Sequence, residues 1–298
     1  MIDVPTLATS LVQAWGLPNP QIVVYQGGMG SATWFVTQDG CRWVAKAVAP
    51  ALRRQFVGGL AVAAAVDAAG IPAGAAVPTR EGQPVTTVAG HPVALLRWVA
   101  GEPLTGVGRD EQQLIGETLA RVHRSVEGVS VAEADRFHWV RLEADHLAIR
   151  PWVRPAVAAA VAALETSGVH SLSWGLLHAD PAPEHFRLEA ATGQCGLIDW
   201  SVALEGPLLY DLASAVMYVG GPGNADSLVE AYLHQSVLPA VEVEQAMLVM
   251  LRFRWAVQAD YFAHRIANHD LTGISGPADN EKGLEDARRW LSHLEDTA

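Results

Sequence analysis

Several kinds of residue and segment are scarce in this sequence, and each scarcity excludes a class of protein. The 298 residues include two cysteines, Cys41 and Cys195, which form no CxxC pair, so we expect no disulfide framework and a reducing compartment. The net charge of −12 argues against a nucleic-acid-binding face, which would need basic side chains. No apolar run approaches the roughly 18 residues of a membrane span, and the N-terminal residues lack the pattern of a signal peptide. We therefore expect a cytoplasmic protein that binds neither nucleic acid nor a membrane.

Lysine is also rare. Of the 20 basic residues, only Lys46 and Lys282 are lysines. Arginine supplies positive charge everywhere else, so each lysine is a candidate for a specific role, although a surface position is the simpler interpretation. Half of the residues are hydrophobic and 17% are charged, which allows a sizeable core. The length suggests one large or two modest domains.

Strand-like and helix-like segments divide the chain into two parts. Strands punctuated by glycine dominate before Gly101, and helices dominate after it. We predict an α+β, two-lobed fold, with a small β-rich N-terminal lobe (residues 1–98) and a larger, mainly helical C-terminal lobe (residues 99–298). The predicted helices cover residues 5–15, 51–69, 109–126, 151–166 and most of the chain after 208. The predicted strands cover residues 21–26, 32–38, 41–48, 75–82, 91–99, 175–179, 185–190 and 195–200.

A glycine-rich turn, QGGMGSATW (residues 26–34), joins two of the predicted strands. Backbone N–H groups around Gly28 can bind phosphate oxygens, and Ser31 adds a hydroxyl donor. Lys46 follows on a strand, WVAKAV, from which its ammonium group would reach the phosphates if it points beneath the turn. A plain hairpin loop and a surface lysine are the alternatives. The turn is no Walker A motif, because no Gly-Lys-Ser/Thr follows it.

Ionisable side chains crowd the segment LLHADPAPEHF (residues 176–186), where two prolines prevent a regular helix or central strand. Some twenty residues later, GLIDW places Asp199 at the end of another predicted strand. If Asp180 and Asp199 lie on adjacent strands, their carboxylates share one rim, which suits a divalent cation bound together with substrate phosphates. One carboxylate would remain free to accept a proton from an attacking hydroxyl. For any one of these residues, including His185, a polar loop that satisfies its own backbone is the alternative.

In their order, these motifs resemble the aminoglycoside phosphotransferase family of small-molecule kinases. The resemblance rests on the glycine turn, the strand lysine, "HAD", "IDW" and "GPLLYDLASAV", and it extends over nearly the whole chain. It implies a protein-kinase-like fold and transfer of the γ-phosphoryl group of ATP or GTP, with Mg²⁺, to a hydroxyl of a small molecule. Lys46 would hold the nucleotide phosphates, Asp180 would orient or deprotonate the acceptor hydroxyl, and Asp199 would bind Mg²⁺. The resemblance further implies that His178 and Asp211 brace the catalytic loop, and that the backbone around Leu96–Val99, including Leu96 and Trp98, meets the base.

Two features depart from the family pattern. His185 stands where the family usually has a metal-binding asparagine, and the macrolide phosphotransferase branch is similar in having a histidine there. Imidazole can ligate Mg²⁺, although hard cations prefer oxygen, and Glu184 is a possible substitute ligand. The helix after Lys46 reads VGGLA where a glutamate partner for the lysine would be expected. Lys46 would then pair with Asp199, with Gln55 or with the nucleotide.

The acceptor pocket is expected on the helices of the large lobe. The segment FRWAVQADYFAHRIANHD combines aromatic and acidic side chains, and residues 137–147 offer a second rim. Helix packing and a solvated face are the alternative. An antibiotic of the aminoglycoside or macrolide type is the expected acceptor; the rivals are a sugar, amino alcohol or fructosamine-like metabolite, and a pseudokinase that only binds nucleotide. The candidate acceptor residues are Asp260, Tyr261, His264 and Asp270.

Overall fold

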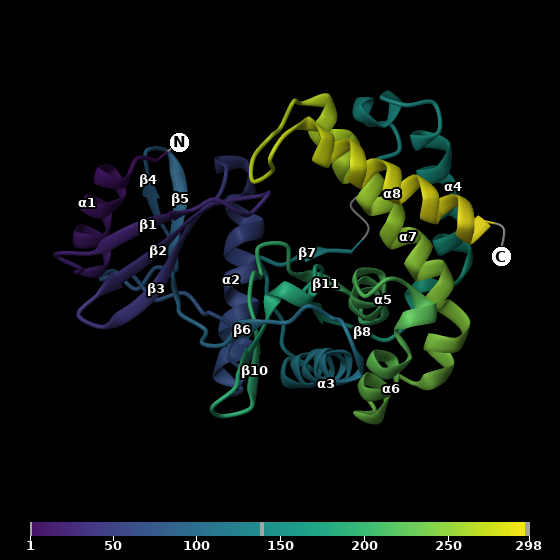
Figure 1. The fold of residues 1–298 in the computed structure, drawn as a ribbon, viewed down its shortest axis with the longest axis horizontal. Coiled ribbons are helices and arrows are strands. Elements are labelled where there is room, and N and C mark those ends of the chain that lie inside the picture. The colour runs from purple at the N-terminus through teal and green to yellow at the C-terminus, as the bar shows by residue number, and fades with distance from the viewer. Residues whose placement is uncertain (1, 138–139, 296–298) are drawn as a thin grey trace.

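The computed structural model describes residues 2–137 and 140–295 of the chain. Its N-terminal part is an antiparallel sheet with the strand order β1-β2-β3-β5-β4. Figure 1 shows this sheet at one end of the molecule and the helical part at the other. The β-rich lobe and the helical lobe expected from the sequence are thus confirmed. The strands of the sheet are β1 (Gln21–Tyr25), β2 (Ala32–Gln38), β3 (Cys41–Ala47), β4 (Thr86–Val88) and β5 (His91–Arg97).

Helix α1 (Val4–Trp15) begins and ends at residues with strong local preferences. The Asp3 carboxylate accepts the N–H of Thr6 at 2.7 Å, which caps the first turn, and Gly16 ends the helix with a φ of 75°. Leu7 and Leu11, one turn apart, are fully buried against the sheet. This face of the sheet is therefore closed by α1.

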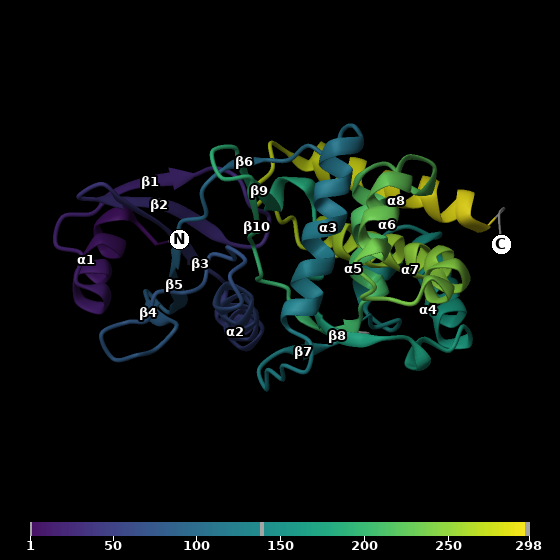
Figure 2. The same ribbon diagram turned by 90° about the horizontal axis from the view of Figure 1, so that it is seen from below.

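The opposite face of the sheet carries the lysine singled out from the sequence. Side chains alternate along a strand, so Ala45 and Ala47 of β3 point toward α1 while Lys46 points the other way. Helix α2 (Arg53–Ala68) covers part of this second face, where Phe56 packs with the sheet. Figures 1 and 2 both show α2 between the sheet and the helical part.

The C-terminal part holds the largest hydrophobic core. Helix α7 packs against α4, α5 and α8, and α3 packs against α6. Two small sheets, with the orders β10-β9-β6 and β7-β11-β8, lie beside these helices (Figure 2). The helices are α3 (Arg109–Ser125), α4 (Val153–Thr166), α5 (Leu209–Tyr218), α6 (Asp226–His234), α7 (Ala240–Ala267) and α8 (Pro277–Glu295); the strands are β6 (Glu102–Pro103), β7 (Asp135–Arg136), β8 (Trp174–Leu177), β9 (Phe186–Glu189), β10 (Gln194–Leu197) and β11 (Leu204–Pro207).

Two expectations about strands are wrong. Residues 75–82 form no regular strand, and only an isolated bridge joins Ala76 to Leu96. Pro78 has no N–H for a ladder, and a turn follows in which the Gly82 N–H donates to the Thr79 carbonyl at 2.8 Å. The second wrong expectation is that the strands before Asp180 and Asp199 are adjacent. Strand β8, before Asp180, pairs with β11, whereas β10, before Asp199, pairs with β9.

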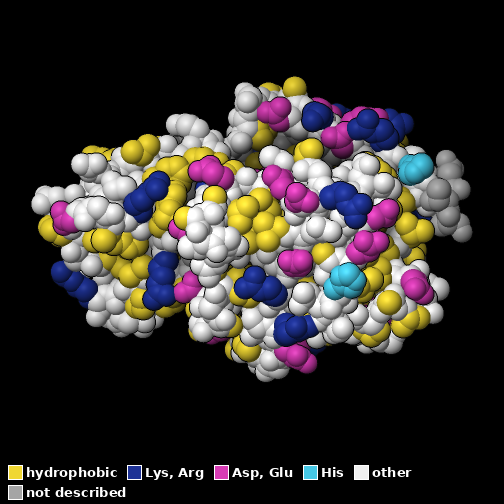
Figure 3. Space-filling model, turned by 60° about the horizontal axis from the view of Figure 1, so that its bottom comes forward, with side chains coloured by type: hydrophobic (Ala, Val, Ile, Leu, Met, Phe, Trp, Pro, Cys, Tyr) yellow, Lys and Arg dark blue, Asp and Glu magenta, His cyan; other side chains and the backbone are white. Residues whose placement is uncertain are grey.

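Charged side chains are interspersed on the surface of the helical part. On the face shown in Figure 3, basic and acidic side chains lie among one another, while apolar side chains gather over the N-terminal sheet region. That face therefore offers no continuous basic stripe. In the described part of the chain, no helix is both long and apolar enough to cross a membrane.

Candidate active site

The segment after β8 is an irregular loop that a buried histidine fixes in place. His178 is fully buried, and its Nε2–H donates to the Ile198 carbonyl at 2.8 Å, while Nδ1 accepts the N–H of Asp180 at 3.3 Å. Burial lowers the pKa of His178, and the neighbouring His185 adds to this, so the His178 ring is neutral and keeps this tautomer. The loop is thereby tied to the residue before Asp199, although the two strands do not pair.

A buried carboxylate holds the start of the same loop. Asp211, on α5, accepts the main-chain N–H groups of His178 and Ala179, both at 2.7 Å. Its Oδ2 also lies 3.0 Å from Nε2 of His123, whose Nδ1 meets the Tyr232 hydroxyl at 2.8 Å. Ala179 has a φ of 68°, a left-handed conformation that costs an alanine about 1–2 kcal/mol. Asp211 therefore offsets backbone strain in the loop.

Asp180 projects from this loop and has two partners that the sequence interpretation missed. The hydroxyl of Tyr218 donates to its Oδ1, and Nη2 of Arg254 lies 3.2 Å from the same oxygen. Burial raises the pKa of Tyr218 well above its usual range, and the Asp180 charge adds to this, so the phenol stays a donor. Helical spacing places Arg254 on the same helix face as Tyr261, seven residues later, but it does not show that this face meets Asp180.

Lys46 and Asp199 meet across the two lobes. The ammonium group of Lys46 is buried and lies 2.5 Å from Asp199 Oδ1, which also accepts the Ser201 hydroxyl at 2.9 Å. Burial by itself would raise the pKa of Asp199, but Lys46 and then His185 outweigh it and hold that pKa well below its usual range. Of the three partners foreseen for Lys46, the structure shows Asp199.

The structure also explains why the helix after Lys46 has no glutamate. The two glycines of VGGLA lie where α2 touches backbone of the other lobe. A Cβ on Gly59 would be 1.9 Å from the carbonyl oxygen of Trp200, and one on Gly58 would be 2.6 Å from that of Glu133. Because α2 lies directly on the segment after Asp199, no side chain fits there, and Asp199 itself neutralises Lys46.

His185 lies between the two aspartates. Its Nδ1 is 2.8 Å from the Asp180 carbonyl oxygen, which can only accept, so in the neutral ring Nε2 carries the lone pair. Nε2 is 4.0 Å from Asp199 Oδ2, too far for a hydrogen bond and far enough for one cation to lie between them. Glu184 is exposed on the turn before His185. The described residues contain no cluster of three or more His, Cys, Asp or Glu side chains that could hold a metal ion, and protein-bound Mg²⁺ commonly completes its shell with waters and substrate phosphates.

The residues expected to hold the nucleotide lie on or near the face of the sheet that carries Lys46. Gly28 has a φ of 98°, which favours glycine, and the buried Ser31 hydroxyl is 3.4 Å from that of Thr33. Leu96 pairs with Val44 on β3 and so shares the face of Lys46. Trp98 follows β5; the Arg42 guanidinium lies 3.7 Å from its ring centre, and Phe35 meets it edge-on at 5.7 Å.

The four acceptor candidates are less free than expected. Asp260 binds Nε2 of His146 at 2.7 Å, and the ring of His264 lies edge-on to His146 at 5.2 Å. Asp270 accepts the N–H of Thr272 within its own loop. Burial raises the pKa of the Tyr261 hydroxyl, and the charges of Asp270 and Asp180 add to this. Within the second expected rim, residues 138–139 lie outside the described part of the chain.

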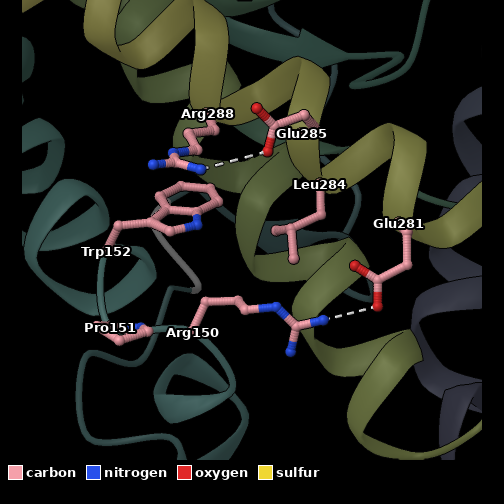
Figure 4. Close-up of a pocket in the computed structure, with 7 residues that line it drawn as sticks. All are labelled: Arg150, Pro151, Trp152, Glu281, Leu284, Glu285 and Arg288. Carbon is pink, nitrogen blue, oxygen red and sulfur yellow. Dashed lines mark hydrogen bonds and ion pairs between the residues drawn. The ribbon is translucent and has the colours of Figure 1, made fainter.

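A surface hollow of about 360 Å³ lies elsewhere, between residues 150–152 and α8 (Figure 4). Its charged side chains are paired: Arg150 donates to Glu281 at 2.8 Å, and Arg288 lies 3.7 Å from Glu285. None of its lining residues belongs to the loop around Asp180 or to the N-terminal sheet. We therefore place no substrate in it.

Comparison with known proteins gives a consistent result. The model of the phosphotransferase enzyme family matches residues 21–245. Homoserine kinase of Caulobacter vibrioides is 23% identical over 240 residues, which cover 76% of this chain and 74% of that protein. A solved microcompartment-associated aminopropanol kinase has a TM-score of 0.76 at 19% identity, with 98% of this chain and 97% of that chain covered. An amicoumacin kinase solved with AMP-PNP, Ca²⁺ and Ami has a TM-score of 0.75 at 17% identity, with 99% and 94% covered.

The solved structures share the two-lobed, protein-kinase-like fold, which confirms the fold class expected from the sequence. The class of protein is thus a kinase for small molecules with a nucleotide as donor. The chain belongs to the phosphotransferase enzyme family, and the resemblance stated from its motifs is confirmed. The closer kinship with the macrolide branch stays a prediction.

Proposed function

We propose that the protein transfers the γ-phosphoryl group of ATP, with Mg²⁺, to the hydroxyl of a small amine-bearing alcohol. The observation that carries the proposal is the one-sided anchoring of Asp180. Tyr218 and Arg254 both bind Oδ1, and no described side chain hydrogen-bonds Oδ2. The side chain is about one third exposed, so Oδ2 is left to accept the hydrogen bond of an acceptor hydroxyl.

The relatives support the class of acceptor. Homoserine and aminopropanol, named in the homoserine kinases and the aminopropanol kinase, each carry an amine and a hydroxyl group. A net charge of −12 favours the approach of a cationic acceptor. An antibiotic acceptor, the expectation from the sequence, is the other candidate.

Catalysis would rest on positioning and charge neutralisation, because the transition state of phosphoryl transfer needs little covalent help from the protein. Lys46 and the turn around Gly28 would bind the phosphates, and Lys46 also pairs with Asp199. His185 Nε2 and Asp199 Oδ2 would hold Mg²⁺, which when bound would neutralise negative charge on the phosphates. Asp180 would orient the acceptor hydroxyl and take its proton as the new bond forms.

Nucleotide turnover with a panel of acceptors tests the proposal. Purified protein with Mg²⁺ and ATP or GTP is given homoserine, 1-amino-2-propanol, ethanolamine, choline, an aminoglycoside or a macrolide, and release of nucleoside diphosphate is followed. We expect one amino alcohol to be turned over with a kcat/KM at least about 100-fold above that of either antibiotic. If an antibiotic is turned over preferentially, the proposal that the acceptor is an amino alcohol is wrong. Nucleotide binding without turnover of any acceptor would favour a pseudokinase.

Asp180→Asn tests the role of the carboxylate in the same assay. We expect kcat to fall at least about 1000-fold, while the dissociation constant of ATP changes less than about threefold. Asp286→Asn, on an exposed ion pair of α8 with Arg289, is the matched control and should leave both values unchanged. Retained turnover in Asp180→Asn would contradict the proposed mechanism.

A further inference from the structure

The loop between α7 and α8 touches the glycine-rich turn of the other lobe. Residues 268–276 extend from the helical part toward the tip of the N-terminal sheet (Figure 1). A Cβ on Gly273 would lie 2.3 Å from the Gly28 carbonyl oxygen and 2.9 Å from the Met29 nitrogen. Gly273 also has a φ of 70°. The two backbones are therefore in direct contact, at a position that favours glycine twice over.

A single arginine near the end of α7 fastens this contact. Arg265 is 1% exposed, and its Nη1 donates to the Met29 carbonyl at 2.8 Å. Its Nη2 donates to the Thr272 carbonyl at 2.7 Å, and its Nε donates to Asn280 Oδ1 at 2.9 Å. One guanidinium thus joins the glycine-rich turn, the α7–α8 loop and α8. Lysine cannot reproduce this planar fork with its single ammonium group.

The charge of this arginine is locally balanced. Asp270 Oδ2 lies 3.3 Å from Nη1 of Arg265, and the Tyr261 hydroxyl lies at the same distance. A buried cation is costly unless its hydrogen bonds and its counter-charge are all present, so the arrangement is sensitive to separation of the lobes. Separation of the two lobes would remove the Met29 carbonyl and leave Nη1 without a main-chain acceptor.

Helix α7, which carries Arg265, also contacts Asp180 through Arg254. Arg254, which binds Asp180, precedes Arg265 by eleven residues, or about three helical turns. The two arginines therefore lie on one face of α7, about 16 Å apart along its axis. One rigid helix contacts both the catalytic loop and the turn expected to bind the phosphates.

We propose that Arg265 is a positioning residue that fastens the glycine-rich turn over the nucleotide, in register with Asp180. It adds a link between the lobes to the chain connection after Trp98, the Lys46–Asp199 ion pair and the contact of α2 with the Trp200 carbonyl. The inference rests on the proposed nucleotide site at the turn. A nucleotide whose phosphates lie under the turn leaves only after the Arg265–Met29 contact opens, so this contact sets the rate of nucleotide release.

Stopped-flow release of the fluorescent nucleotide mant-ADP, with Mg²⁺ and without acceptor, tests the proposal. We expect Arg265→Met to accelerate release about tenfold, since one hydrogen bond to a charged donor holds the turn. The release rate of Arg265→Lys should lie between those of the wild type and Arg265→Met. The matched control is Arg150→Met, which removes an exposed ion pair to α8 and should leave release within twofold of the wild type.

Gly273→Ala provides an independent variant that keeps every charge. Its methyl group would push the α7–α8 loop away from Gly28, so release of mant-ADP should again accelerate. This variant tests the proposal even if Arg265→Met fails to fold. Hydrogen exchange of the peptide spanning residues 26–31 should rise in both variants. Unchanged release in folded Gly273→Ala or folded Arg265→Met overturns the proposal. Failure of the wild type to bind mant-ADP would instead overturn the nucleotide site as well.

Discussion

Replacing Asp211 with asparagine keeps the shape of the side chain but removes one of the two oxygens that hold the loop before Asp180. In the structure, Oδ1 accepts the Ala179 N–H, and Oδ2 accepts the His178 N–H and faces His123. The less harmful orientation of the new amide keeps its oxygen at the Oδ2 position and points its NH₂ group at the Ala179 N–H. Two donors then face each other at a fully buried position.

The expected loss of stability follows from these contacts. A buried donor left without an acceptor costs about 1–3 kcal/mol, and the two remaining hydrogen bonds change from charged to neutral, which costs about 1 kcal/mol more in total. Release of the desolvation cost of the carboxylate offsets part of this sum. We expect Asp211→Asn to lower the free energy of unfolding by about 3 kcal/mol.

Urea denaturation followed by circular dichroism measures that loss. Hydrogen exchange of the His178 and Ala179 amides shows whether it is local to the loop, which is important because a two-lobed protein can unfold in more than one step. A displaced loop should also lower kcat by on the order of 100-fold. Asp286→Asn, at a partly exposed position on α8, should cost less than about 0.5 kcal/mol. A loss below about 0.5 kcal/mol for Asp211→Asn, with both amides still protected, would refute the reasoning.

Two further predictions concern the histidines of the loop. His178→Gln should flatten the pH dependence of stability: the buried ring of the wild type resists protonation, so the unfolded chain takes up the proton first and stability falls as the pH drops below about 6.5, by up to about 1.4 kcal/mol per pH unit. Urea denaturation between pH 5 and 8 measures this, and equal slopes in both proteins would contradict it. His185→Asn should weaken binding of Mn²⁺ relative to Mg²⁺ in the nucleotide complex by about tenfold, because an amide oxygen replaces imidazole nitrogen. Competition followed by Mn²⁺ paramagnetic resonance measures the preference, and an unchanged preference would remove His185 from the metal site.

Sequence reasoning located the parts of the site that local patterns encode. The glycine turn, the strand alternation around Lys46 and the crowded loop around Asp180 depend on neighbours in the chain, and the structure shows Lys46 and Asp199 in direct contact. The distribution of strand-like and helix-like segments also predicted the two lobes. Alternation predicts that Lys46 points to the opposite face of β3 from Ala45 and Ala47, although all three residues are buried. Elements of this kind need no knowledge of the distant chain.

Residues that act through tertiary packing were not predictable in this way. Arg254 and Tyr218 reach Asp180 only because α5 and α7 pack against each other, and helical periodicity says nothing about which helices meet. The pairing of β8 with β11 rather than β10 is a contact of the same kind. Asp260 was assigned to an acceptor pocket from the aromatic and acidic composition of its segment. In the structure it binds His146, which is 114 residues away in sequence.

The missing helix glutamate shows how packing changes the meaning of a sequence feature. In the sequence it is a departure from the family pattern, because such kinases pair the strand lysine with a helix glutamate. In the structure, Gly59 lets α2 lie directly on the Trp200 carbonyl, and this contact fixes the backbone just after Asp199, whose φ is 69°. Lys46 then finds its counter-charge in Asp199 itself. The helix therefore supports the lysine through backbone contact rather than through a carboxylate, and the two glycines follow from this arrangement instead of indicating decay.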